Sequence, residues 1–178
     1  MKKILVTGAK GYLGTHLVSR LKEDGYDVRQ FARPHPDTPQ SELDDPDIVW
    51  GDVRDSEAVE RAVKGVDKVI HTISNFRHGG SDKDEAYAIN VEGTENVLNA
   101  CLKYKVKRLV HCSTIGVHGD VKEVPARETT PFNPCDLYQE TKLIAEQKVW
   151  EFSKKREARF PLVVSLWLKL SLQSLTRA

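Results

Sequence analysis

Two side chains that can exchange a proton, Tyr138 and Lys142, stand four residues apart. At that spacing they share one face of a helix. A lysine cation beside a tyrosine favours the phenolate and lowers the pKa of the phenol toward neutral pH, as a general acid or base at a carbon–oxygen centre requires. A Tyr-x-x-x-Lys pair is common by chance, but a hydroxyl pair, Ser113 and Thr114, also follows a predicted strand. Together these residues predict proton transfer to or from a carbonyl or alcohol oxygen.

A glycine-rich run at residues 7–14, Thr-Gly-Ala-Lys-Gly-Tyr-Leu-Gly, lies between a short apolar segment and a segment with helical spacing. The glycines allow a tight turn and let the backbone approach a pyrophosphate, while the helix N-terminus offers free N–H groups to the anion. Three glycines in a loop are more often only a turn. Their place inside a βαβ unit nevertheless favours dinucleotide binding.

The choice between the two nicotinamide dinucleotides depends on the residues that follow the second predicted strand. An acid about 20 residues beyond the glycines binds the ribose hydroxyls of NAD, whereas an arginine there suits the 2′-phosphate of NADP. Asp27 lies at the wrong end of that strand, while Arg33 and Lys10 are both placed to favour NADP. The alternative is that both are solvated surface cations. We expect NADP to bind more tightly than NAD.

Apolar runs and segments with helical spacing alternate along the chain and define the elements that position these groups. Asp55 is placed to cap the helix that follows it. The segments 33–47, with four prolines, and 113–134 are predicted loops. Predicted strands cover residues 4–6, 27–32, 48–50, 68–73, 108–112 and 160–166, and predicted helices cover 13–21, 56–63, 86–104 and 138–156.

This alternation predicts an α/β fold, a Rossmann-type doubly wound parallel sheet with strand order 3-2-1-4-5-6 in a single domain. In such a sheet ligands bind at the carboxyl ends of the strands, near the point where the strand order reverses. The loops after the first, fourth and fifth strands should therefore hold the chemistry. We expect residues 1–166 to form the dinucleotide-binding domain and residues 167–178 an atypical C-terminal tail.

Composition and charge exclude several classes of protein. A chain of 178 residues, 39% hydrophobic and 30% charged, is long enough for one globular domain. Its net charge of +1 gives no field for nucleic acid or an acidic membrane surface, so we expect neither as a partner. Three cysteines that fit no disulfide framework, and an N-terminal apolar run too short for a signal peptide, predict a cytoplasmic location.

Three histidines, His71, His111 and His118, could suggest a metal site. They lie on or beside predicted strands, without a His-x-x-x-His pair or a partnering acid. We therefore predict no metal and interpret these histidines as structural or substrate-lining.

With these motifs in order, the chain resembles a known family, the extended short-chain dehydrogenase/reductases, also called the NAD(P)-dependent epimerase/dehydratase group. The resemblance extends from Lys2 to about Leu166. The matching motifs are the glycine run at 7–14, Gly-Asp-Val at 51–53, Val-Ile-His at 69–71, Asn-Val-Glu-Gly-Thr at 90–94, Ser-Thr at 113–114 before Val-His-Gly at 117–119, Glu128 with Pro131 and Pro134, and Tyr138-x-x-x-Lys142 before Ala-Glu at 145–146. So many ordered matches are highly specific.

The resemblance implies a role for each matching residue. Tyr138 would be the acid/base at the reacting oxygen and Thr114 would hold that oxygen, while Lys142 would bind the nicotinamide ribose and stabilise the tyrosinate. Asn90 matches the helix asparagine that supports the site, with a structural hydrogen bond that bends the helix as an equal alternative. The cofactor-binding residues expected from the motifs and the resemblance together are Gly8, Lys10, Gly11, Tyr12, Leu13, Gly14, Arg33, Asp52, Val53, Tyr138 and Lys142.

The activity implied by the resemblance is hydride transfer between nicotinamide C4 and a carbonyl or alcohol carbon of a small-molecule substrate. A nucleotide-sugar epimerase of the same family is the alternative, although no acid lies near Ala32 to hold NAD tightly. Dehydration is disfavoured because Ile115 and Gly116 follow Thr114 where a dehydratase of this family has an Asp-Glu pair.

The C-terminal end departs from the family pattern and suggests a further interpretation. After Leu166 the family continues with an arginine-proline pair and a substrate-binding lobe, whereas this chain runs Trp167-Leu168-Lys169 and ends at Ala178. The chain would then be a non-catalytic cofactor-binding domain without a complete substrate site. On this interpretation we expect NADP(H) binding, little or no turnover, and a homodimer or other self-association through the apolar C-terminal region.

Overall fold

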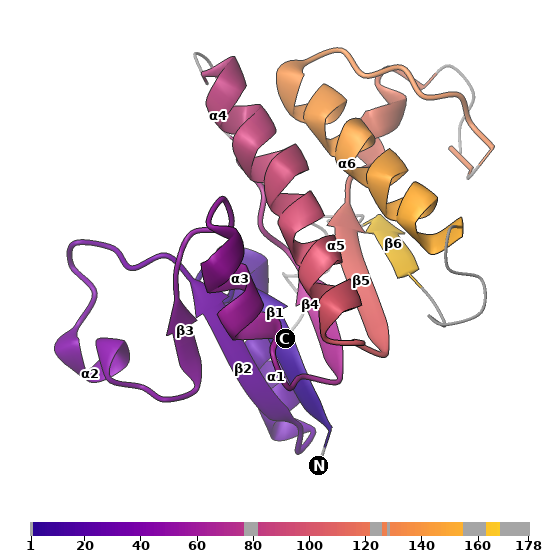
Figure 1. Cartoon of the computed structure of the whole chain (residues 1–178). Helices are drawn as coiled ribbons and strands as arrows, with labels where there is room; N and C mark the ends of the chain where they lie inside the picture. Colours follow the sequence, from indigo (N-terminus) through magenta and orange to yellow (C-terminus); the bar gives the residue numbers. More distant parts are fainter. Residues whose placement is uncertain (1, 77–81, 122–125, 128, 155–162, 168–178) are drawn as a thin grey trace, which may run out of the picture.

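A six-stranded parallel β-sheet forms the centre of the molecule (Figure 1). The computed structural model describes residues 2–76, 82–121, 126–127, 129–154 and 163–167. The strands are β1 (Lys3–Thr7), β2 (Asp27–Ala32), β3 (Ile48–Trp50), β4 (Lys68–His71), β5 (Arg108–Ser113) and β6 (Val163–Trp167). Their order across the sheet is β3-β2-β1-β4-β5-β6, so the predicted Rossmann-type order is confirmed.

Helices cover both faces of this sheet. In Figure 1, α3, α5 and α6 lie in front of the strands and α1 lies behind them. The helices are α1 (Tyr12–Glu23), α2 (Gln40–Leu43), α3 (Ser56–Val63), α4 (Lys83–Tyr87), α5 (Gly93–Lys103) and α6 (Leu137–Lys154), with a π-helical turn at Ala88–Glu92 and a 3₁₀ turn at Ile115–His118. Within the described part of the chain, no helix is both long and apolar enough to cross a membrane.

The two faces of the sheet bury different sets of apolar side chains. Leu5 of β1 packs in the larger core with Val97 of α5 and Val149 of α6. The next residue, Val6, packs on the other face against Val18 of α1. Both β1 side chains are fully buried. Because both faces are covered, the strand is a continuous apolar run in the sequence, which is the pattern that predicted a parallel sheet.

Helix α3 begins where its sequence predicts. The Asp55 side chain accepts hydrogen bonds from the backbone N–H groups of Glu57 (2.9 Å) and Ala58 (3.2 Å), two of the four N–H groups that a helix start leaves without a helical partner. The helix ends at Val63, and Gly65 then takes a positive φ of 82°. This cap fixes where α3 begins after the loop that follows β3, and the buried side chains of α3 pack it on the sheet.

The segment predicted as one helix from 86 to 104 consists of three consecutive pieces. Helix α4 begins earlier, at Lys83, because the Asp82 side chain caps it by accepting from the Asp84 N–H (3.0 Å). The π-helical turn at Ala88–Glu92 follows, and α5 continues to Lys103. A π-helical turn inserts a residue into the helical repeat, and apolar spacing alone does not reveal it.

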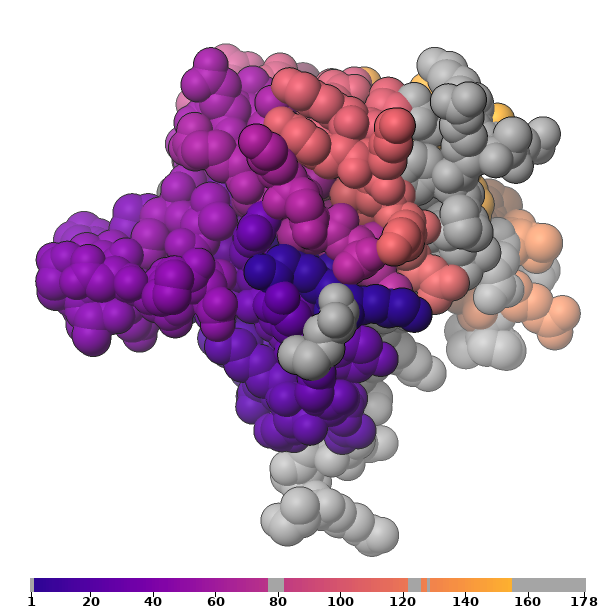
Figure 2. All heavy atoms as spheres, turned by 60° about the horizontal axis from the view of Figure 1, so that its bottom comes forward, coloured from indigo at the N-terminus to yellow at the C-terminus, as the bar shows by residue number. Residues whose placement is uncertain are grey.

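Other boundaries also differ from the prediction. The predicted loop at 33–47 contains α2, and the segment that carries it projects beyond β3 as the purple lobe at the left of Figure 2. Strand β4 ends at His71, two residues early, because the Thr72 hydroxyl turns back to donate to the Thr7 carbonyl (2.7 Å).

Near the C-terminus, β6 is described over Val163–Trp167 and ends one residue beyond the predicted strand at 160–166, whose residues 160–162 lie outside the described residues. Helix α6 is described to Lys154. The predicted end of that helix at 156 lies outside the described residues, as does the predicted tail after Trp167.

Candidate active site

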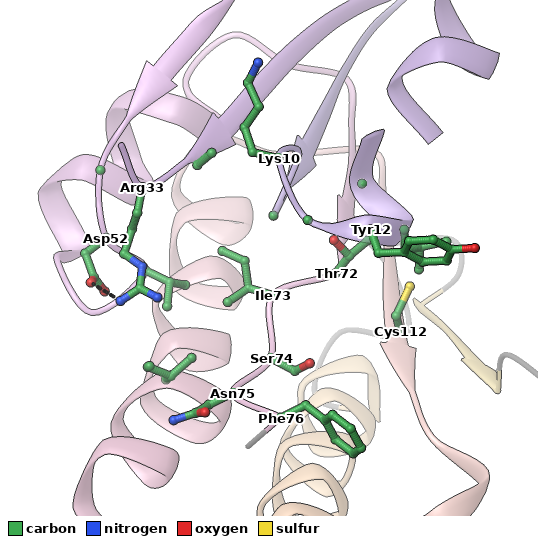
Figure 3. Close-up of a pocket in the computed structure, with 18 of the residues that line it drawn as sticks. Lys10, Tyr12, Arg33, Asp52, Thr72, Ile73, Ser74, Asn75, Phe76 and Cys112 are labelled. Atoms are coloured by element: carbon green, nitrogen blue, oxygen red, sulfur yellow. Dashed lines mark ion pairs between the residues drawn. The ribbon is translucent and has the colours of Figure 1, made fainter. Parts of the chain in front are cut away.

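A cleft of about 1040 Å³ opens at the carboxyl edge of the sheet. Its walls come from the loops after β1 to β5 and from the start of α6 (Figure 3). Asn90 and Lys142 are not among its lining residues. The other predicted site residues all line it: Gly8, Lys10, Gly11, Tyr12, Leu13, Gly14, Arg33, Asp52, Val53, Thr114 and Tyr138.

The glycine loop forms one wall of this cleft. Gly8 has a φ of 72°, a left-handed conformation that favours glycine, and its N–H donates to the Phe31 carbonyl (2.8 Å). A Cβ at Gly14 would overlap the Gly8 carbonyl oxygen, so α1 can approach β1 this closely only without a side chain there. No side chain caps α1 at Gly11. The loop therefore fits a pyrophosphate, which accepts hydrogen bonds from backbone N–H groups at a helix start.

Asp52 lies at the end of the cleft that follows β3, and two arginines surround it. Arg54 donates to both of its carboxylate oxygens, at 3.0 and 2.7 Å, and an Arg33 guanidinium nitrogen lies 3.5 Å from one of them. The hydrogen bond from Arg54 is the largest cause that holds the pKa of Asp52 below its ordinary value. The sequence analysis missed Arg54, although its place two residues after Asp52 was a signal that it could reach that carboxylate.

Lys10, the second predicted cation, is also paired. Its ammonium lies 2.6 Å from a carboxylate oxygen of Glu42 on α2. In Figure 3 the Lys10 side chain points away from Arg33, whose guanidinium points to Asp52. The two cations thus face different carboxylates, whereas the sequence analysis placed both toward one phosphate. Glu42 was missed because no helix was predicted in the proline-rich segment.

Tyr138 stands at the start of α6 among polar and aromatic neighbours. Burial raises the pKa of its phenol, and hydrogen bonds with the Thr114 and Ser74 hydroxyls act in the opposite direction. The Phe76 ring meets the Tyr138 ring edge to face, with centroids 4.6 Å apart. Ser74 and Phe76 were not predicted individually. Their only signal was their position after β4, in a loop expected to hold chemistry.

Lys142 shares the helix of Tyr138 but has a different environment. It is 2% exposed, and its ammonium donates to the Cys112 carbonyl (2.7 Å). Burial lowers the pKa of Lys142 to about 8. The expectation that Lys142 lowers the pKa of Tyr138 is therefore wrong for this structure, because its ammonium is directed at the backbone of β5 and burial governs the phenol.

Asn90 lies in the π-helical turn and connects two other segments. Its amide oxygen accepts from the Asn75 N–H (2.6 Å), and its amide nitrogen donates to the Thr141 hydroxyl (2.9 Å). The side chain is buried. Asn90 therefore holds the loop after β4 against α6 at Thr141, the residue that precedes Lys142. It acts on the cleft through Asn75 and Thr141.

The buried histidines differ in their partners. His71 faces the hydroxyls of Thr7 (2.7 Å) and Thr94 (3.2 Å), and burial lowers its pKa to about 3. His111 is fully buried with its ring 5.5 Å from that of His71, and burial lowers its pKa as well. His118 stacks on Phe132. Among the described residues, no three histidine, cysteine or acidic side chains gather as metal ligands.

Comparisons with known proteins agree with this geometry. The profile of the NAD dependent epimerase/dehydratase family matches residues 4–165. A 3 beta-hydroxysteroid dehydrogenase/Delta 5-->4-isomerase from Mycobacterium tuberculosis is 37% identical over 159 residues, a match that covers 83% of this chain and 42% of that protein. A UDP-glucose 4-epimerase from Halalkalibacterium halodurans is 35% identical over 151 residues, covering 81% and 44%.

Among solved structures, a short-chain dehydrogenase/reductase superfamily protein from Agrobacterium tumefaciens, with bound NAD, matches with a TM-score of 0.74 and 31% identity. The match covers 88% of this chain and 45% of that one. The chain spans less than half the length of these three proteins.

Proposed function

The chain belongs to the NAD dependent epimerase/dehydratase family, and from that premise we propose that its cleft binds a nicotinamide dinucleotide for hydride transfer to or from a carbonyl or alcohol carbon. One observation carries this proposal. The glycine loop and the Tyr138 phenol, far apart in the sequence, line the same cleft of about 1040 Å³. The glycines fit a pyrophosphate, and the phenol with its hydroxyl neighbours suits the reacting end of the same elongated ligand.

In the proposed reaction, a bound dinucleotide supplies or accepts the hydride at its nicotinamide C4 carbon. Thr114 donates a hydrogen bond that orients the substrate oxygen. Tyr138 gives its phenolic proton to that oxygen during reduction and takes it back during oxidation. Because burial raises the pKa of Tyr138, the phenol carries the proton that reduction of a carbonyl requires.

We assign the remaining polar groups to binding. We assign Lys142, one helical turn after Tyr138, to the nicotinamide ribose. To bind the ribose, its ammonium would either keep its hydrogen bond to the Cys112 carbonyl as well or give it up. Arg33 and Lys10 support a preference for NADP over NAD, because a 2′-phosphate gains charge-assisted hydrogen bonds from such cations. Asn90 acts as a positioning residue for the loop after β4 and for α6.

Calorimetric titration of the chain with NADP and NAD tests the cofactor assignment. We expect saturable binding with one dinucleotide per chain. Gly11→Val should weaken it strongly, because Gly11 has an ordinary backbone conformation but its added Cβ would lie 3.2 Å from the Gly8 carbonyl oxygen and crowd the glycine loop. Gly25→Asn, where nothing lies within 4 Å of an added Cβ, is the matched control at the other end of α1. Failure of the wild-type chain to bind either dinucleotide would contradict the proposal.

Epimerisation is the second candidate, supported by the 35% identity to the UDP-glucose 4-epimerase. The two activities differ in their demand for cofactor. A reductase consumes one reduced dinucleotide for each product, whereas an epimerase regenerates its dinucleotide in every turnover. In a form of the protein that turns over a substrate, stoichiometric loss of absorbance at the wavelength of the reduced nicotinamide therefore supports the oxidoreductase, and product formation without that loss supports the epimerase.

A further inference from the structure

Lys10, one of the two cations that the proposed function assigns to the 2′-phosphate, already forms an ion pair with Glu42. The Lys10 ammonium lies 2.6 Å from the Glu42 carboxylate, a contact distance for a charge-assisted hydrogen bond. Arg33 has a looser contact, 3.5 Å from Asp52, and Asp52 is already bound more closely by Arg54. Of the two cations assigned to NADP, Lys10 is therefore the one that an internal anion holds more closely.

A second cavity locates this pair beside the dinucleotide cleft. It has a volume of about 180 Å³ and shares Lys10, Arg33 and His35 with the larger cleft. Glu42 and Trp50 line only the smaller cavity. Glu42 thus lines the smaller cavity together with Arg33. This cavity adjoins the cleft at the loop after β2, where we expect a 2′-phosphate to bind.

We propose that Glu42 is a specificity-determining residue that acts as an internal competitor of the 2′-phosphate for Lys10. The inference rests on the proposed function, because it concerns how the same cleft distinguishes NADP from NAD. A phosphate that approaches Lys10 meets the negative charge of Glu42 and has to displace it. The ribose hydroxyl of NAD carries no charge, so its binding is little affected by Glu42.

The exposure of the pair makes this exchange feasible. The Lys10 and Glu42 side chains are 35% and 44% exposed, and ion pairs that contact water contribute little stability. Glu42 belongs to a helix of four residues whose N-cap, Pro39, provides no side-chain cap. The carboxylate can therefore be released without breaking the core, and the site retains a built-in bias against a doubly charged phosphate.

Calorimetry with NADP and NAD on Glu42→Gln, Lys10→Met and the double variant tests the role of Glu42. Glu42→Gln should tighten NADP binding by about fivefold, because it frees Lys10 from a water-exposed ion pair. NAD binding should change by less than about twofold, since the ribose hydroxyl is uncharged. The gain should vanish when Lys10→Met is combined with Glu42→Gln, because the competition requires the ammonium. Far-UV circular dichroism and thermal melting verify that each variant is folded.

Glu60→Gln is the matched control. Glu60 pairs with Lys103 at the same distance, 2.6 Å, at the end of α5 that leads into β5. It should leave both affinities unchanged. Equal tightening of NAD and NADP by Glu42→Gln, no tightening, or a gain that persists without Lys10 would overturn the role of Glu42 while leaving dinucleotide binding intact. Absence of binding of either dinucleotide to the wild-type chain would overturn the proposed function and this inference together.

Discussion

Tyr138 is held by hydroxyl groups from the ends of two neighbouring strands. Ser74 follows β4 and Thr114 follows β5, and both hydrogen-bond the phenol. The Thr114 hydroxyl also accepts from the Gly116 N–H (3.1 Å), which fixes it at the start of the 3₁₀ turn. A substrate oxygen that enters between Thr114 and Tyr138 would replace one of these hydrogen bonds, so little rearrangement is needed before proton transfer.

Replacement of the phenol should separate proton transfer from cofactor binding. In a form of the protein that turns over a substrate, we expect Tyr138→Phe to reduce kcat by about 10²- to 10⁴-fold, because it removes the proton carrier. The dinucleotide Kd should stay within about threefold, since the ring and its contact with Phe76 remain. Lys142→Ala should damage both quantities. Retention of most activity by Tyr138→Phe, measured by steady-state kinetics, would show that another group moves the proton.

The charge of Arg33 should matter only for the phosphorylated dinucleotide. Arg33→Ala should weaken NADP by roughly 1.5 to 3 kcal/mol through loss of a charge-assisted hydrogen bond, and NAD by much less. Arg20→Ala, which removes an exposed cation paired with Asp24 on α1, is the control and should change neither affinity. Calorimetry in low salt measures both. An equal loss for NAD and NADP would mean that Arg33 contacts a part common to both cofactors.

Helix α6 and strand β5 are joined by side chains spaced four residues apart on the helix. Tyr138 bonds Thr114, Lys142 donates to the Cys112 carbonyl, and Glu146 accepts from the Ser113 hydroxyl. The last two residues of β5 and the residue that follows them are thereby bound by three successive turns of the helix. This pairing fixes the position of α6 along β5, and with it the position of both residues that we assign to the reacting end of the cleft.

Of the three helix residues, Glu146 is the one whose replacement should lower the free energy of unfolding most without changing a residue that lines the cleft. It is 2% exposed, and its negative charge raises the pKa of the buried Lys142 against the effect of burial. We expect Glu146→Gln to lower the free energy of unfolding by roughly 1.5 to 3 kcal/mol, the range for hydrogen bonds to charged groups. It should also lower the pKa of Lys142 further. Urea denaturation and an NMR titration of labelled lysine measure the two effects.

Glu140→Gln on the same helix is the control for Glu146. Glu140 accepts from the Tyr87 hydroxyl at the surface (2.7 Å), and its replacement should change stability by less than about 0.5 kcal/mol. Equal effects of the two substitutions would show that the buried contact with β5 does not set the stability of this helix.

The sequence predicted elements better than contacts between them, and the reasons are physical. The short β2 and β3 segments and the cap at Asp55 carry local signals, and their boundaries agree with the structure. The π-helical turn and the Glu42 ion pair depend on how distant segments pack, so neither leaves a local pattern. The orientation of the Lys142 side chain also depends on a distant segment. Its ammonium binds a carbonyl of β5, which the spacing of residues on α6 does not reveal.

At the scale of the whole molecule, two buried histidines should make stability depend on pH. Burial lowers the pKa of both His71 and His111, that of His71 to about 3. An unfolded histidine binds a proton near pH 6.5, so below that pH the unfolded chain takes up protons that the folded chain does not. The contribution of His71 is fully present above about pH 7 and is lost as the pH falls from about 6.5 toward 3, at ~1.4 kcal/mol per pH unit. That of His111 is lost in the same direction.

Denaturant unfolding at several pH values between 7.5 and about 5 measures this dependence. His71→Gln keeps a partner for the Thr7 hydroxyl but removes one titrating group, so the slope of unfolding free energy against pH should become shallower. His35→Gln, on the exposed loop after β2, should leave the slope as it is. An unchanged slope in His71→Gln would mean that this ring is protonated equally in the folded and unfolded chain.

While the chain is being synthesised, β1 has a neighbour on only one side for several seconds. Strand β2 follows it closely, but the contact between Thr7 and His71 of β4 joins residues 64 positions apart. At a translation rate of about 5–20 residues per second, His71 is added roughly 3–13 s after Thr7. During this interval the open edge of β1, beside Leu5 and Val6, is a template for pairing with a strand of another nascent chain. Emergence of β4 therefore closes a window for intermolecular association on the ribosome, before any residue of α6 has been made.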